Sequence, residues 1–150
     1  MRIAYCGFAS DVKRILKPLV EECAWLTPAW CHEMQVHWCA GAGGEDLTAP
    51  ARCGVDYAYR KVHLYIYPAF LDGGEAWRRK TMYHELIHGL TEVFVDYAER
   101  EMKRVLDTHE ASYRDSILEE MRVRREGMVE DFARCISEHE AKKTKGKRND

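Results

Sequence analysis

The chain has 150 residues, of which 46% are hydrophobic and 32% are charged, a length and composition typical of one globular domain. It contains no run of about 20 apolar residues, so we expect no membrane partner. Lysine and arginine number 23 against 25 for aspartate and glutamate, and the resulting net charge of -2 predicts no attraction to nucleic acid.

The first part of the chain predicts one helix and the beginning of a small sheet. Residues 2–6 alternate as a short strand, and Ser10 then offers an N-cap for a helix whose apolar period reaches Cys23. Apolar residues recur at every second position over residues 33–38, which predicts a half-buried strand. The glycine-rich stretch 41–50 predicts a loop.

Two further strands are predicted before the period of the sequence becomes helical. The first is indicated by alternation over residues 55–59, and the second by alternation over residues 62–67, which Pro68 ends. From about Glu75 apolar residues recur at three- and four-residue steps, which predicts a long amphipathic helix. The apolar stripe of this helix consists of Leu86, Leu90, Val93 and Tyr97.

A second long helix is predicted to begin between residues 107 and 116 and to form a hairpin with the first. Its expected apolar stripe consists of Leu118, Met121, Met128, Phe132 and Ile136. Residues 142–150 have no apolar side chain to bury, so they predict a disordered basic tail. The predicted fold is therefore α+β, a single domain over residues 1–141 in which a small mixed or antiparallel sheet packs on the first long helix and the second follows it.

The first long helix contains an HExxH motif at residues 84–88. Residues four apart stack on one face of a helix, so His84 and His88 can reach the same metal ion. This face points away from the apolar stripe of the helix, toward a cleft. Two imidazoles bind Zn²⁺ and leave it able to lower the pKa of a bound water to about 7, and Glu85 is placed to accept the proton.

Beyond the motif itself, the sequence resembles a known family. Residues 81–90 fit the extended zincin metallopeptidase signature, and residues 125–134 resemble the glutamate helix of the gluzincins. The resemblance covers about residues 60–134 and is closest to the small intracellular and phage-type minimal members. It implies a zinc-dependent enzyme that hydrolyses peptide bonds of a peptide or protein substrate. In zincins an edge strand beside the motif helix pairs with the substrate backbone, and Lys61–Tyr67 is the candidate for that strand.

The resemblance also implies roles for individual residues. It makes His84 and His88 zinc ligands, Glu85 the general base and Glu126 the third zinc ligand. Glu130, one turn further on, matches a carboxylate that supports the ligands from behind, although the family often has aspartate there.

Residue chemistry alone leaves the third ligand more open. A catalytic zinc site needs three protein ligands and a water, and position 94, where a nearby third histidine would stand, is Phe94. A distant carboxylate is then expected, and Glu126 and Glu119 lie at similar angles on the second helix, with the resemblance favouring Glu126. Three side chains remain open as stabilisers of the oxyanion: Tyr97, His109 and Tyr113.

The sequence also contains a second group of possible metal ligands. Cys31, His32, His37, Cys39 and Cys53 have zinc-binding side chains, but without a CxxC pair and with a strand between them they predict structural residues. The six cysteines and the absence of a leader at the first residues predict reduced thiols and a cytoplasmic protein. Two other functions stay open: a zinc-containing binding or interaction protein without peptidase activity, and a helical-hairpin interaction protein in which HExxH is accidental.

Overall fold

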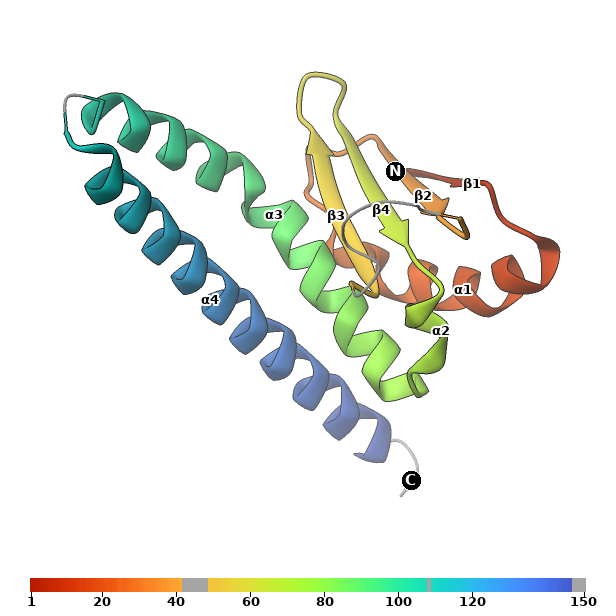
Figure 1. Cartoon of the computed structure of the whole chain (residues 1–150). Helices are drawn as coiled ribbons and strands as arrows, with labels where there is room; N and C mark the ends of the chain where they lie inside the picture. The colour runs from red at the N-terminus through yellow and green to blue at the C-terminus, as the bar shows by residue number, and fades with distance from the viewer. Residues whose placement is uncertain (42–48, 108, 147–150) are drawn as a thin grey trace.

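The computed structural model describes residues 1–41, 49–107 and 109–146, and its fold class is the predicted α+β (Figure 1). Most of the predicted loop at 41–50 and the last four residues lie outside the described residues. In chain order the elements are β1 (Arg2–Cys6), α1 (Ser10–Cys23), the short 3₁₀ helix η1 (Ala24–Leu26), β2 (Glu33–Trp38), β3 (Ala51–Asp56), β4 (Lys61–Ile66), α2 (Ala69–Asp72), α3 (Glu75–Val105) and α4 (Ala111–Gly146).

The four strands form one mixed sheet in the order β1-β2-β4-β3. β1 and β4 run parallel to β2, whereas β3 runs antiparallel to β4 and forms an edge of the sheet. Alternate residues of the two central strands, such as Val36 and Leu64, are fully buried in the core beneath α1 and α3. The intervening residues face away from this core, because side chains alternate across a strand.

Two sequence predictions about the strands are wrong. The strand expected at residues 55–59 lies at Ala51–Asp56 instead, and the chain turns at once after it. The carboxylate of Asp56 accepts a hydrogen bond from the backbone N–H of Tyr59 at 3.2 Å and closes the turn, although the alternating pattern runs through it. The strand at Lys61–Ile66, expected at the edge, has ladder partners on both sides, so β3 is the edge strand beside α3.

The two long helices form the predicted hairpin, but their buried faces differ from the expected stripes. α3 buries Met82, Tyr83, Leu86 and Ile87 in the core, while Leu90 and Tyr97 are exposed. The C-terminal half of α3 extends past the sheet. α4 buries Val129 and Ala133 in place of Met128 and Phe132, which are 44% and 52% exposed. The contact face of α4 is thus rotated from the predicted one by about one residue, or 100°.

α4 also continues to Gly146, so the disordered tail predicted from residue 142 is wrong over residues 142–146. Alanine and lysine are good helix formers, and positive charge near a helix C-terminus is favoured by the helix dipole. The remainder of that tail, 147–150, lies outside the described residues. Within the described chain, each helix is too short or too polar to cross a lipid bilayer.

Candidate metal centre

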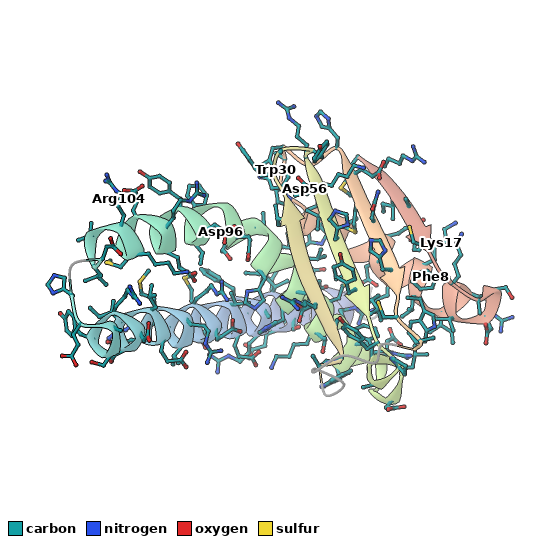
Figure 2. All side chains as sticks on the ribbon, turned by 45° about the horizontal axis from the view of Figure 1, so that its top comes forward. Phe8, Lys17, Trp30, Asp56, Asp96 and Arg104 are labelled. Atoms are coloured by element: carbon teal, nitrogen blue, oxygen red, sulfur yellow. The ribbon has the colours of Figure 1, made fainter. Side chains whose placement is uncertain are left out.

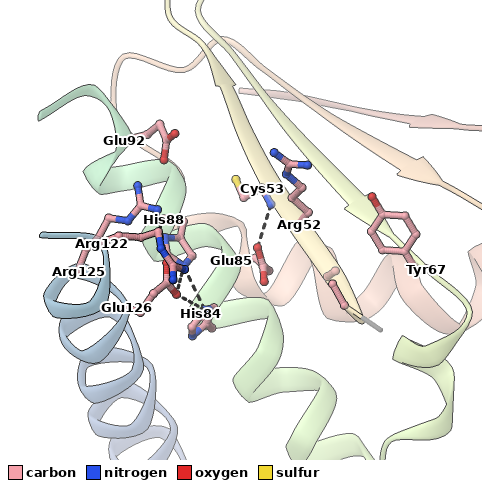
Figure 3. A pocket seen from close by; sticks show the side chains of 12 residues that line it. Arg52, Cys53, Tyr67, His84, Glu85, His88, Glu92, Arg122, Arg125 and Glu126 are labelled. Atoms are coloured by element: carbon pink, nitrogen blue, oxygen red, sulfur yellow. Dashed lines mark hydrogen bonds and ion pairs between the residues drawn. The ribbon is translucent and has the colours of Figure 1, made fainter. Parts of the chain in front are cut away.

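Three side chains from the two long helices meet at one point (Figure 3). The motif on α3 supplies His84 and His88, one turn apart, and the antiparallel α4 supplies Glu126. The His88 Nε2 atom lies 3.1 Å from His84 Nε2 and 3.2 Å from Glu126 Oε2, and His84 Nε2 lies 3.7 Å from Glu126 Oε2. Among the described residues, this is the one group of three such side chains that converges in this way.

The dimensions of this triangle fit a zinc ion. Ligand atoms about 2.0–2.1 Å from a tetrahedral zinc stand about 3.3 Å from one another, close to the three separations observed. Burial lowers the pKa of His88, with Glu126 partly offsetting it, so the imidazole favours the neutral form that binds a metal. His84, His88 and Glu126 therefore fit a zinc ion by both donor type and spacing.

The outer side of His84 is supported by a second carboxylate. Glu130 Oε2 lies 3.4 Å from His84 Nδ1, and the other oxygen of Glu130 is paired with Lys80. The hydrogen bond from Lys80 lowers the pKa of Glu130 and keeps it ionised. An ionised acceptor at Nδ1 favours the tautomer whose Nε2 lone pair points into the centre, which is the role that the family resemblance implies for Glu130.

Glu85 lies beside the triangle, between α3 and the edge strand. Its Oε2 atom accepts a hydrogen bond of 2.9 Å from the backbone N–H of Cys53 in β3. Burial raises the pKa of Glu85 to about 7, because it outweighs the stabilisation that this bond gives to the carboxylate. Glu85 is thus a carboxylate held by the scaffold and close to the candidate metal ligands without being one of them.

Close packing of α3 on β3 depends on Gly89, which follows the motif directly. A Cβ atom at this position would stand 3.0 Å from Cys53 Sγ. The missing side chain lets the helix approach the strand whose N–H holds Glu85.

Two cavities open on the site. The larger, of about 510 Å³, is lined by His84, Glu85, His88 and Glu126 together with Arg52, Arg122 and Arg125. The smaller, of about 350 Å³, shares His84 and Glu85 and is otherwise lined by residues that include Trp77 and Lys80. Space therefore extends to both sides of Glu85.

Of the two glutamates left open by the sequence, the structure brings only Glu126 to the histidines. Glu119 is exposed and binds Arg122 at 2.9 and 2.6 Å. The three oxyanion candidates, Tyr97, His109 and Tyr113, do not line either cavity. Tyr97 stands about 13.5 Å along α3 from His88, at a rise of about 1.5 Å per residue.

Four lining residues of the larger cavity had no predicted role of their own: Arg52, Tyr67, Arg122 and Arg125. Tyr67 and Arg125 lie in segments that the sequence singles out, but Arg52 and Arg122 belong to none of the predicted motifs. Two of the side chains considered for a second zinc site have other partners: Cys31 donates to the backbone oxygen of Glu33, and His37 pairs with His63 at 3.3 Å.

Comparison of the chain with protein-family models, with curated proteins and with solved structures finds no match. The function is therefore inferred from the geometry and chemistry of the site.

Proposed function

We propose that the chain is a zinc-dependent peptidase. The observation that carries this proposal is the triangle of His84 Nε2, His88 Nε2 and Glu126 Oε2, with Glu85 on the same cavity wall. Two imidazoles and one carboxylate are a donor set of catalytic zinc sites, which keep a position open for water or substrate. Bound there, zinc supplies a Lewis acid and lowers the pKa of water to about 7.

The remaining chemistry belongs to residues of the chain. Glu85 accepts a proton from the attacking water on its carboxylate and returns it to the leaving amine nitrogen, as a general base and then a general acid. The hydrogen bond from Cys53 N–H holds the carboxylate against β3 in the orientation that this transfer needs. Glu130 and Lys80 orient His84 from the opposite side.

A peptide substrate is supported by the position of β3. It is the edge strand of the sheet beside α3, and it runs along the larger cavity through Ala51, Arg52 and Cys53. An extended peptide can add to such an edge by backbone hydrogen bonds, which presents its amide bonds in a regular register. The proposal includes a cytoplasmic location, where the six free cysteines would stay reduced.

Metal analysis and a peptide hydrolysis assay test this proposal together. We expect about one zinc per chain, lost in His84→Ala because a ligand is removed. Glu85→Gln should keep the zinc and lower the hydrolysis rate by at least 100-fold, since it lacks the general base. Glu120→Gln, an exposed change on α4, is the control and should alter neither.

Two results would contradict the proposal. A wild-type protein that holds no zinc after purification without chelators and addition of zinc has no such site. A zinc-loaded protein whose biological activity is unaffected by Glu85→Gln would be the zinc-containing interaction protein instead.

A further inference from the structure

Positive side chains line the larger cavity from two opposite elements. Arg52 comes from β3, and Arg122 and Arg125 come from α4, so the candidate metal centre lies between them (Figure 3). Arg122 is already engaged, because two of its nitrogens donate to Glu119. Arg52 and Arg125 are the two guanidinium groups whose role is open.

Neither of these two arginines has a full set of partners among the described residues. Arg52 is exposed, and its side chain forms no hydrogen bond or ion pair with any of them. Arg125 is only 21% exposed and reaches Glu126 Oε1 at 3.4 Å, a long contact for a charged pair. Its Nε–H is buried and donates to no described residue, which costs free energy in the absence of a ligand.

The charges of Arg52 and Arg125 act on the same part of the cavity. Glu92, one turn after His88, also lines the cavity. Burial and the charge of Asp96 raise the pKa of Glu92, whereas the charges of Arg125 and Arg52 act in the opposite direction. The other carboxylates in the lining, Glu85 and Glu126, belong to the proposed zinc site. Glu92 is thus the one carboxylate in the described lining left to balance two guanidinium groups.

We propose that Arg52 and Arg125 bind a carboxylate group of the substrate beside the bond that is cleaved. Guanidinium groups bind carboxylates through paired, charge-assisted hydrogen bonds, and Arg125 has an unused donor for one. The inference rests on the proposed function and names its substrate class, an anionic peptide. A cavity of about 510 Å³ accommodates a short peptide segment with that group.

The carboxylate has two sources, an aspartate or glutamate side chain or the C-terminus of the peptide. The second cavity on the other side of Glu85 leaves room for the chain to continue past the site. Peptides in matched pairs separate the two sources: one series carries glutamate or glutamine at a single position with an amidated end, and the other has a free or an amidated C-terminus.

The matched peptides can be alanine-rich octapeptides. Their binding to zinc-loaded Glu85→Gln protein tests the inference without requiring cleavage. We expect the carboxylate-bearing member of one pair to bind at least tenfold more tightly than its neutral partner. Arg52→Gln and Arg125→Gln should each abolish the preference, and Glu92→Gln should strengthen it by removing the competing carboxylate. Arg124→Gln is the matched control, because Arg124 is exposed on α4 and pairs with Glu120. Zinc content and melting temperature show whether each variant is folded.

Equal binding within both kinds of pair, or a preference that survives both arginine substitutions, would overturn the inference. These outcomes are separate from those of the proposed function. Wild-type protein that binds acidic peptides through Arg52 but never cleaves them contradicts the peptidase and supports the carboxylate site. Cleavage that requires Glu85 but does not depend on peptide charge supports the peptidase and contradicts the carboxylate site.

Discussion

Glu126 and Glu130 lie one turn apart on α4 and face different nitrogens of the same histidine. Glu126 Oε2 is 3.7 Å from His84 Nε2, on the side that also holds His88. Glu130 Oε2 is 3.4 Å from His84 Nδ1, on the outer side. The two residues therefore have different expected roles at the metal, the first as a ligand and the second as the group that orients a ligand.

Substitution of these glutamates should give graded losses of zinc affinity. Glu130→Gln should lower the affinity about 10- to 100-fold, the usual cost of losing a group that orients a ligand, and Glu126→Ala should lower it further. Glu119→Ala should leave it unchanged, because Glu119 binds Arg122 away from the histidines. Competition with a chromophoric chelator measures all three. A larger loss in Glu119→Ala than in Glu126→Ala would reassign the third ligand.

The junction of α3 with β3 positions Glu85, the proposed general base. Gly89→Val would place methyl groups against Cys53, Val55 and Val62, whose nearest atoms are 3.0, 4.0 and 3.8 Å from the added Cβ. We expect the free energy of unfolding to fall by about 1–3 kcal/mol. Gly127→Ala on α4 is the control, since its Cβ would meet nothing within 4 Å, and it should raise stability by up to about 1 kcal/mol. Urea denaturation measures both. Wild-type stability in Gly89→Val would mean that α3 does not pack closely here.

The open face of the sheet carries a second pair of histidines, which predicts a pH dependence of stability. His37 on β2 lies 3.3 Å from His63 on β4 and stacks on Tyr65. Burial, and then the charge of His63, lowers the pKa of His37. As the pH falls, His37 therefore takes up a proton at a higher pH in the unfolded chain than in the folded one. This contribution to stability is complete above the ordinary histidine pKa of about 6.5 and is lost as the pH falls below it.

His37→Gln removes this proton uptake, so its free energy of unfolding should fall less than that of the wild type between about pH 7 and about pH 5. His139→Gln, at an exposed position of α4 outside the sheet, controls for the loss of a histidine. Denaturant titrations across this pH range measure the free energy of unfolding of the wild type and of both variants. Parallel profiles for wild type and His37→Gln would show that His37 is not the group responsible.

The sequence predictions that are correct depend on residues within one helix or strand. Those that are wrong or missing depend on contacts between elements. Helical spacing alone places His84, Glu85 and His88 together, and alternation alone predicts β2. The buried face of α4 depends on how it crosses α3, so the sequence pattern favoured Phe132 where the structure buries Ala133. Arg52 lines the same cavity as Arg122 and Arg125 of α4 only because β3 packs beside the helical hairpin. The spacing of these residues in the sequence does not predict this.

The whole molecule divides into an α+β body and an arm formed by the C-terminal half of α3 and the N-terminal half of α4 (Figures 1 and 2). In the body, α3 buries Met82 and Leu86 almost completely. In the arm, Phe94, Tyr97 and Val105 are 78%, 63% and 63% exposed. The ion pairs of the arm, such as Arg104 with Glu101, are exposed and contribute little each. The candidate zinc ligands lie where the arm leaves the body.

This division predicts uneven local stability along the same two helices. Amide hydrogen exchange should be slowest at residues 82–88 and 129–133, which pack in the core, and at least tenfold faster at residues 94–105 and 111–121, where less apolar surface is buried. Removing zinc with a chelator should speed exchange around residues 84–88 and 126 most, because bound metal joins α3 to α4 there and stabilises the folded form by mass action. Mass spectrometry of peptides from each half of α3 and α4, with and without zinc, separates the difference between body and arm from the effect of the metal. Equal protection along the whole of α3 would contradict the division, since it would require the exposed face at Phe94 and Tyr97 to be covered in solution.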